Sequence, residues 1–279
     1  MLRHLLLAFQ FFTRLPLPKS WADWVGFDQQ AMRAAMVHWP AVGWVVGLCA
    51  AFVFHGVLWL WGSQAMLMSA SNLLMVLAAL FSTLATILLT GALHEDGLAD
   101  VADALGGHLP AQRALEVMKD SRVGSYAVIT LVMVLLLKVV LLASLGMVHT
   151  GVAVFGLMAA HAVSRAAALM LASWLPHIGL HQQSKTLQTT GSLQNLPLWQ
   201  AALWCTPLLV CLTLPEGQAL FVIFAFATAC ALVATFCMGW WFKRRLQGIT
   251  GDCLGATQQV AELAFYAGTL TATLNMLLR

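Results

Sequence analysis

A short stretch in the first half of the chain holds the carboxylates best placed to do chemistry. Asp96, Asp100 and Asp103 are spaced at i, i+4 and i+7, so on a helix they lie on one face. Glu95 lies about 100° from that face and can reach its edge. Like charges at this spacing repel one another, and a divalent cation would turn the repulsion into binding. Because closely placed carboxylates suit Mg²⁺ with water and phosphate oxygens, we predict that all four bind Mg²⁺.

The segment MKDSRVGS at residues 118–125 places Asp120 between Lys119 and Arg122. Basic side chains hold phosphate groups, whereas an aspartate can bind a metal ion or accept a proton from a reacting hydroxyl. We predict that Lys119 and Arg122 bind phosphate. Asp120 is predicted to be a further metal ligand or the general base.

A second basic segment, KRRLQGITGDCLGA at residues 243–256, carries Asp252 between glycines. Glycine-rich turns allow the backbone to approach a phosphate closely. We predict that Asp252 faces the same cleft as residues 96–103, where it is a further metal ligand or the general base. Arg244 and Arg245 are predicted to bind phosphate across from it. The basic triplet also suits a topological anchor on the cytoplasmic side, and the two roles are compatible.

Other readings of the acidic stretch are weaker. A solvated turn at a helix start would also favour acids, but this chain has only eleven acids, and four of them lie within residues 95–103. His94 and Glu95 begin an HExxH zinc motif, which Leu98 fails to complete. The chain has no GxGxxG and no GxxxxGK[ST] phosphate-binding loop.

The composition identifies the elements that must position these residues. Charged residues make up 9% and hydrophobic residues 61% of the chain, against about 25% charged residues in soluble domains. We predict a single all-α integral membrane domain over residues 1–279 that lies in the lipid bilayer. An N-terminal interfacial amphipathic helix is predicted to precede about seven transmembrane helices, over residues 40–61, 66–92, 126–148, 151–175, 200–214, 217–242 and 258–278.

Basic residues fix the predicted orientation. With seven spans, eleven lysines and arginines fall on one side of the membrane, and Arg279 alone falls on the other. The excess of positive charge marks the cytoplasmic side, which would place the N-terminus and the segments 93–125 and 243–257 there. The basic residues are too sparse for a nucleic-acid surface. A transporter would show related halves and charges spread across the midplane, and we find neither.

A few charged or titratable residues fall inside the predicted spans: Lys138, His161, Arg165 and Glu262. Such residues are costly in a bilayer and are normally paired or functional. One interpretation is a buried structural network in which Glu262 or backbone carbonyls pair with the cations. The other is a polar cavity open to the cytoplasm, in which Arg165 binds substrate phosphate.

Several motifs together resemble one family, the cobalamin synthases (adenosylcobinamide-GDP ribazoletransferases) of bacterial and archaeal membranes. They occur in family order over nearly the whole chain, and no single one would be specific. Gln247 stands where the family pattern has glycine, and residues 176–199 match no family motif. The matching segments are FFTRLPLP at 11–18, WPAVGWVVG at 39–47, the ExDGxxD pattern at 95–100, RALEVMKDSRVGSYAV at 113–128 and TGDCLGA at 250–256.

The resemblance implies a Mg²⁺-dependent enzyme of the bacterial cytoplasmic (inner) membrane. Its substrates would be adenosylcobinamide-GDP and α-ribazole or α-ribazole 5′-phosphate, joined with release of GMP in the last assembly step of coenzyme B12. A homo-oligomer is possible. The closest rival enzyme class is the CDP-alcohol phosphotransferases, whose Asp-rich signature is related but expects an arginine that the segment after Asp100 lacks.

Overall fold

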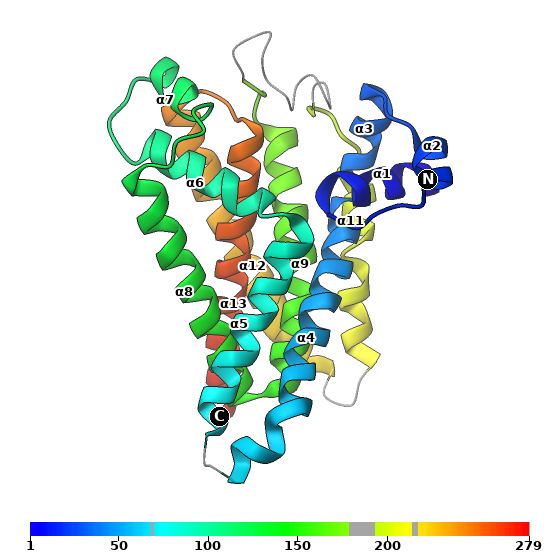
Figure 1. Cartoon of the computed structure of the whole chain (residues 1–279), viewed down its shortest axis with the longest axis vertical. Helices are drawn as coiled ribbons and strands as arrows, with labels where there is room; N and C mark the ends of the chain where they lie inside the picture. The colour runs from blue at the N-terminus through cyan, green and yellow to red at the C-terminus, as the bar shows by residue number, and fades with distance from the viewer. Residues whose placement is uncertain (68–69, 179–192, 214–216, 279) are drawn as a thin grey trace.

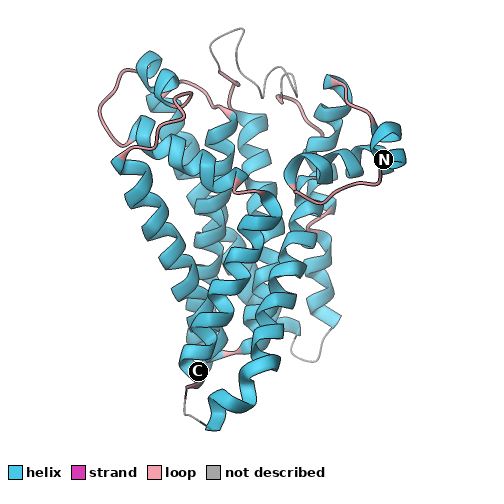
Figure 2. Ribbon diagram, in the orientation of Figure 1, coloured by secondary structure: helices cyan, strands magenta, loops and turns pink. Residues whose placement is uncertain are grey.

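The protein is a bundle of long helices with short helices gathered at one end (Figure 1). The computed structural model describes residues 1–67, 70–178, 193–213 and 217–278. Within these residues the regular structure is helical, and the one β-bridge, between His177 and Ile249, is isolated (Figure 2). The long helices are α4 (Trp39–Leu67), α5 (Ser71–Thr90), α8 (Ser125–Val148), α9 (Thr150–Trp174), α12 (Gly217–Arg245) and α13 (Gly251–Leu277).

The prediction of an all-α multi-pass membrane protein is confirmed. Among the described residues, five helices are long and apolar enough to cross a bilayer: α4, α5, α8, α9 and α12. With 27 residues, α13 is long enough, at about 1.5 Å per residue, but it is more polar than the other five. Its glutamines and Glu262 are buried inside the bundle, where other helices rather than lipid surround them.

The fifth predicted span, over residues 200–214, is not a continuous α-helix. The structure has a short helix α11 (Leu198–Leu203), followed by a 3₁₀ helix η1 (Thr206–Thr213). Pro207 lacks a backbone N–H and restricts the residue before it, which explains why α11 does not continue. The count of seven spans is therefore not confirmed.

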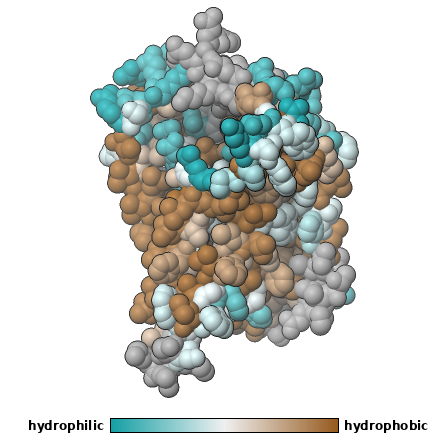
Figure 3. Space-filling model, turned by 45° about the vertical axis from the view of Figure 1, so that its right-hand side comes forward, coloured by the Kyte–Doolittle hydropathy of each residue, from teal (hydrophilic) through white to brown (hydrophobic). Residues whose placement is uncertain are grey.

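The short helices lie at the end of the bundle opposite the C-terminus (Figure 1). They include the expected N-terminal amphipathic helix, α1, which buries Leu7, Ala8 and Phe12 and exposes Leu2 and Phe11. Figure 3 shows a hydrophobic band around the middle of the molecule, with hydrophilic residues concentrated at this upper end. Besides α11, the short α-helices are α1 (Leu2–Phe12), α2 (Lys19–Val25), α3 (Gln29–Met36), α6 (Leu93–Leu105) and α7 (Ala111–Val117).

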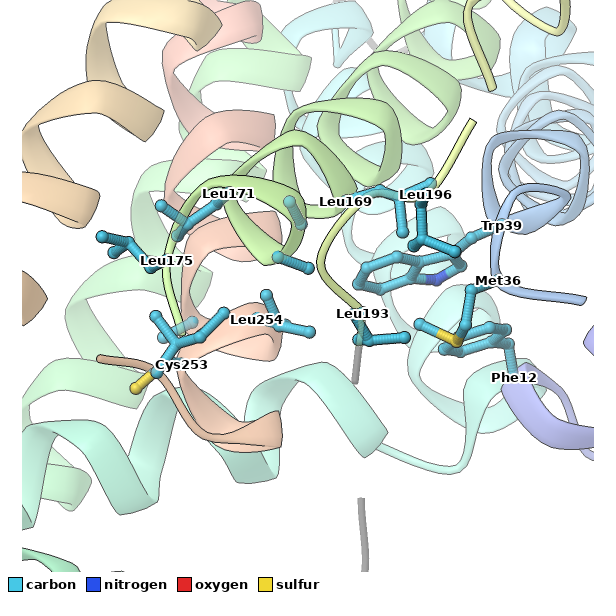
Figure 4. Close-up of a cluster of buried hydrophobic side chains, with 14 of the residues drawn as sticks. Phe12, Met36, Trp39, Leu169, Leu171, Leu175, Leu193, Leu196, Cys253 and Leu254 are labelled. Carbon is cyan, nitrogen blue, oxygen red and sulfur yellow. The ribbon is translucent and has the colours of Figure 1, made fainter. Parts of the chain in front are cut away.

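Close helix packing and two apolar clusters hold the bundle together. On α4, a Cβ atom added to Gly47 would lie 2.6 Å from the Met158 Cα atom of α9, so glycine is needed for the two backbones to approach. One cluster fills the lower bundle. The other lies beneath the short helices (Figure 4), where the rings of Phe12 and Trp39 stack with centroids 4.8 Å apart. The end of the bundle that carries the acidic stretch therefore packs on a buried apolar cluster.

Candidate active site

The acidic stretch forms α6, which begins at a tight turn after α5. Gly91 and Ala92 both have positive φ, 65° and 59°, and the side chain of Arg14 occupies the place where a Cβ atom of residue 91 would be. The turn directs α6 across the end of the bundle (Figure 1). The carboxylates of α6 therefore lie at the end of the bundle rather than along a membrane-spanning helix.

The N-terminus of α13 packs directly against α6. A Cβ atom on Gly97 would lie 2.9 Å from the backbone oxygen of Asp252 and 3.0 Å from its Cα atom, while one on Gly255 would lie 3.2 Å from the backbone oxygen of His94. Only glycine permits this approach. The prediction that the fold brings Asp252 to the 96–103 segment is confirmed, although some 150 residues separate them in the sequence.

Three carboxylates, Asp96, Asp100 and Asp252, form a negatively charged cluster, called here the acidic cluster. Burial raises the pKa of Asp100 to about 7, and the negative charges of Asp252, Asp96 and Asp103 add to the effect. Burial also raises the pKa of Asp252, against a hydrogen bond from Thr250. Among the described residues, no hydrogen-bond or ion-pair partner holds the carboxylate of Asp96 or Asp100. Their charge is therefore available to a ligand.

Asp103 has a structural task at the other end of α6. Its two carboxylate oxygens accept hydrogen bonds from the backbone N–H groups of Gly124, at 2.6 Å, and Ala127, at 2.8 Å. These N–H groups belong to the start of α8, where backbone donors lack partners within the helix. Asp103 thus caps α8, and its predicted role as a metal ligand stays a prediction.

Glu95 points into the bundle instead of toward the acidic cluster. Its side chain is buried, and its Oε1 atom accepts a hydrogen bond from Gln259 of α13 at 3.1 Å. Burial raises the pKa of this carboxyl. The Oε2 atom has no partner among the described residues. This position suits a support for the start of α6 better than direct contact with metal.

In the segment after α7, Asp120 forms an exposed ion pair with Arg122. Asp120 binds Arg122 through both carboxylate oxygens, with the shortest contact 2.6 Å. The hydrogen bonds from Arg122 lower the pKa of Asp120 to about 2, which makes it a weak base. Lys119 is exposed. Among the described residues, no hydrogen bond or ion pair joins these three residues to the acidic cluster.

The two arginines that end α12 differ in their contacts. Arg245 donates hydrogen bonds to the backbone oxygens of Leu105, at 3.1 Å, and Gly107, at 2.8 Å, so it ties the end of α6 to α12. Arg244 lies over the ring of Trp240, 4.3 Å from its centroid. Arg244 is therefore the freer of the two to meet a phosphate.

The charged residues inside the spans form one buried network. The Nζ atom of Lys138 lies 2.6 Å from Glu262, and His161 lies 3.3 Å from the same carboxylate. Arg165 donates a hydrogen bond to the backbone oxygen of His161 at 2.9 Å and is 1% exposed. The structural interpretation of these residues is confirmed. Arg165 lies within the bundle, and its predicted role in phosphate binding stays a prediction.

Sequence reasoning missed the polar residues that link this network to α6. Gln258 donates hydrogen bonds to Glu262, at 2.7 Å, and Ser164, at 3.0 Å, while Gln259 bonds both Gln258 and Glu95. A signal was present, since two adjacent glutamines precede Glu262 in an otherwise apolar stretch. Polar residues within a predicted span mark the face that points into the bundle.

The donor set of the acidic cluster fits Mg²⁺ in part. Across the described residues, no group of three or more histidine, cysteine, aspartate or glutamate side chains is arranged to hold a metal ion by itself. Mg²⁺, however, is usually held by one or two carboxylates and takes its other ligands from water and substrate phosphates. The unpartnered carboxylates of Asp96 and Asp100 meet that need without Glu95 or Asp103.

Comparison with known proteins decides the family. Residues 4–270 match the family model described as Cobalamin-5-phosphate synthase. The chain belongs to this family. Membership in the cobalamin-5-phosphate synthase family agrees with the resemblance seen in the sequence motifs, all of which lie within the matched residues.

Curated relatives of this cobalamin-5-phosphate synthase family member carry the name adenosylcobinamide-GDP ribazoletransferase. A relative from Polaromonas sp. (strain JS666 / ATCC BAA-500) is 45% identical over 281 residues, which cover 95% of both chains. Others come from Leptothrix cholodnii, 41% identical over 95% of this chain and 93% of the relative, and Ralstonia nicotianae, 38% identical over 94% and 92%. No solved structure matches the chain.

Proposed function

We propose that this protein is an adenosylcobinamide-GDP ribazoletransferase. It joins α-ribazole, or α-ribazole 5′-phosphate, to adenosylcobinamide-GDP and releases GMP, which completes adenosylcobalamin or its 5′-phosphate. The observation that carries the proposal is the whole-chain similarity to relatives of that name, at up to 45% identity. The acidic cluster, built from two segments distant in sequence, supplies the chemistry that such a transfer needs.

In the proposed reaction, the ribazole hydroxyl oxygen attacks the phosphorus atom that carries the cobinamide. A new P–O bond forms, and the pyrophosphate P–O bond breaks so that GMP leaves with the bridging oxygen. Such transfers depend on aligned reactants and on neutralised phosphate oxygens. Bound Mg²⁺ would neutralise the pyrophosphate charge.

The side chains divide the remaining work. Asp96 and Asp100 would hold Mg²⁺ with Asp252 beside them. Asp252 is the better candidate to accept the hydroxyl proton, because burial raises its pKa above that of an ordinary aspartate and so makes it a stronger base, whereas Arg122 keeps Asp120 a weak base. Arg244 would bind the departing phosphate, with Lys119 and Arg122 as candidates on the neighbouring segment.

The proposed location is the bacterial inner membrane, with α6 and the N-terminus of α13 on the cytoplasmic face. The gathering of basic residues at the α6 end of the bundle supports this orientation. Arg279, the one basic residue assigned to the opposite side, lies outside the described residues. Nucleotide substrates are made in the cytoplasm, so this orientation would give them direct access.

The test is direct. The full chain in lipid vesicles is incubated with adenosylcobinamide-GDP, α-ribazole 5′-phosphate and Mg²⁺, and both cobamide and GMP are quantified. We expect equimolar products, none with EDTA, and recovery when Mg²⁺ is restored. GMP released without a cobamide would contradict the transfer, and full activity in EDTA would contradict the metal.

A further inference from the structure

A large cavity lies away from the acidic cluster, among the N-terminal helices. Its volume is about 770 Å³, and its walls come from α1, α3, the residues around His38, and residues 195–204. None of the residues that line it belongs to α6 or α13. A cavity of this size is in the range that takes a small-molecule ligand, about 300–1,000 Å³. The proposed transfer gives it no role.

Most of the wall is apolar or aromatic and is held in place by hydrogen bonds. Leu196, Leu203 and Trp204 line it. The indole N–H of Trp204 donates to the Nδ1 atom of His38 at 3.1 Å, and the indole N–H of Trp44 donates to the backbone oxygen of Trp204 at 2.6 Å. The wall is thus preformed, which lowers the cost of binding a ligand.

The cavity also has a cationic end. Arg33 lines it, donates one hydrogen bond from Nη2 to the backbone oxygen of Gln194 at 2.7 Å, and leaves a buried Nε–H without a partner among the described residues. No acidic residue in the described part of the chain lines the cavity. The buried Nε–H is covered by protein atoms, so an oxygen-rich anion such as a phosphate would meet Arg33 through its terminal Nη groups.

Exposed tryptophans lie on the cavity and on the neighbouring helix α2. Trp21, Trp24 and Trp199 are 53%, 56% and 64% exposed, and tryptophans concentrate at membrane–water interfaces. Trp199 and Leu203 line the cavity and are also exposed, so the cavity borders the outer, lipid-facing surface. An apolar body and an anionic head at this level are the features of a phospholipid.

We propose that this cavity binds an anionic phospholipid. The phosphate meets Arg33, and an acyl chain follows the wall formed by Leu196, Leu203 and Trp204. The bound lipid fills the space between the N-terminal helices and α11 and holds them together. This inference is independent of the proposed transfer reaction, since it concerns a different part of the molecule.

The experiment uses the full chain, purified in detergent and stripped of lipid. Dioleoylphosphatidylglycerol or dioleoylphosphatidylcholine is added, bound lipid is counted by native mass spectrometry, and the melting temperature is followed against lipid concentration. Arg33→Gln removes the charge, and Ala34→Phe fills the cavity while keeping Arg33. Arg113→Gln is the matched control, because Arg113 is an exposed arginine far from the cavity lining that pairs with Glu116.

We expect phosphatidylglycerol to bind the wild type and Arg113→Gln alike and to raise their melting temperatures. Arg33→Gln should weaken its binding by about tenfold or more, the effect of losing a charge-assisted hydrogen bond. Ala34→Phe should abolish the tightly bound lipid. If both variants bind phosphatidylglycerol like the control, the proposal is overturned. It is also overturned if α-ribazole 5′-phosphate, and not the lipid, stabilises the protein in an Arg33-dependent way.

Discussion

Two groups of charged residues in this protein contain carboxylates, but the carboxylates differ in whether the fold supplies them with partners. The acidic cluster of Asp96, Asp100 and Asp252 gathers like charges at the end of the bundle, and Asp96 and Asp100 have no partner within the part of the chain that the structure describes. Deep in the bundle, Glu262 is bonded to Lys138 at 2.6 Å and accepts further hydrogen bonds from Gln258 and Tyr266. The carboxylates of the first group repel one another until a cation binds, whereas in the second group the carboxylate of Glu262 is paired within the fold.

The difference separates residues that do chemistry from residues that hold the scaffold. A buried charge survives in a membrane bundle only when paired, because desolvation is costly. A cluster of like charges persists when a ligand compensates the repulsion. We therefore expect changes in the acidic cluster to affect turnover and changes in the buried network to affect stability.

The largest expected effect is on turnover. Asp100→Asn and Asp96→Asn should each reduce cobamide formation by at least about 100-fold, because each removes charge that would hold Mg²⁺. Each change also removes a like-charge repulsion, so the melting temperature of the metal-free protein should stay the same or rise. Product formation is followed in vesicles. Wild-type Mg²⁺-dependent turnover in either variant would remove that residue from the site.

The next effect is on folding. Lys138→Met leaves Glu262 buried without its cation, which should destabilise the protein by about 3–5 kcal/mol. The double variant with Glu262→Gln should recover part of this loss. Leu137→Met, at the neighbouring exposed position, is the control and should be near neutral. Thermal unfolding in detergent measures the stability of all four proteins. If Lys138→Met is as stable as Leu137→Met, the Lys138–Glu262 ion pair is not needed for stability.

A smaller loss is expected where Asp103 caps α8. Asp103→Ala removes the acceptor for the N–H groups of Gly124 and Ala127, and loss of a cap costs about 0.5–2 kcal/mol. Asp103→Asn keeps one acceptor oxygen, so its stability should lie between those of the wild type and Asp103→Ala. Amide hydrogen exchange at the start of α8 should rise in the same order. If activity falls without any change in exchange, Asp103 contacts the ligand instead.

The pH dependence of stability should follow Asp100. Its pKa is about 7 in the folded protein, against 3.8 for an ordinary aspartate. Between these values the folded state keeps a proton that the unfolded state has lost, so this group makes the metal-free protein less stable as pH rises. The raised pKa of Asp252 acts in the same direction. Between pH 5 and 8 the melting temperature of Asp100→Asn should fall less with rising pH than that of the wild type. An equal pH dependence of the two melting temperatures would contradict this account.

The smallest effect is predicted for Asp120. Its ion pair with Arg122 is exposed, and such pairs contribute about 0–1 kcal/mol. Asp120→Asn should therefore barely change stability. Turnover should fall by less than about threefold, within about 0.7 kcal/mol, if Asp252 rather than Asp120 accepts the proton. A loss comparable to that of Asp100→Asn would restore Asp120 as the base.

The sequence predicted the architecture well because a helix that crosses lipid must be long and apolar. Such a helix appears in the sequence as a run of about 20 apolar residues. It failed at residues 200–214, where Pro207 divides an apolar run that composition alone counts as a span. The pairing of Lys138 with Glu262 was also predictable, since a charge in a span needs a partner.

The candidate site was predictable in part. Helical spacing placed Asp96 and Asp100 together, and the glycines around Asp252 indicated a close approach. Spacing alone could not reveal that Asp103 would bond the start of α8, or that Glu95 would turn toward Gln259. Both depend on how α6 lies across the bundle, a tertiary feature that no local pattern encodes.

The glycine contact between α6 and α13 has a consequence for biogenesis. Residues 96–100 leave the ribosome long before Asp252, and at about 5–20 residues per second the interval is roughly 8–30 s. During that time Gly97 of α6 lacks its contact with Asp252, and the partly made chain holds two of the three carboxylates of the acidic cluster. The acidic cluster is therefore complete only after α13 has packed against α6.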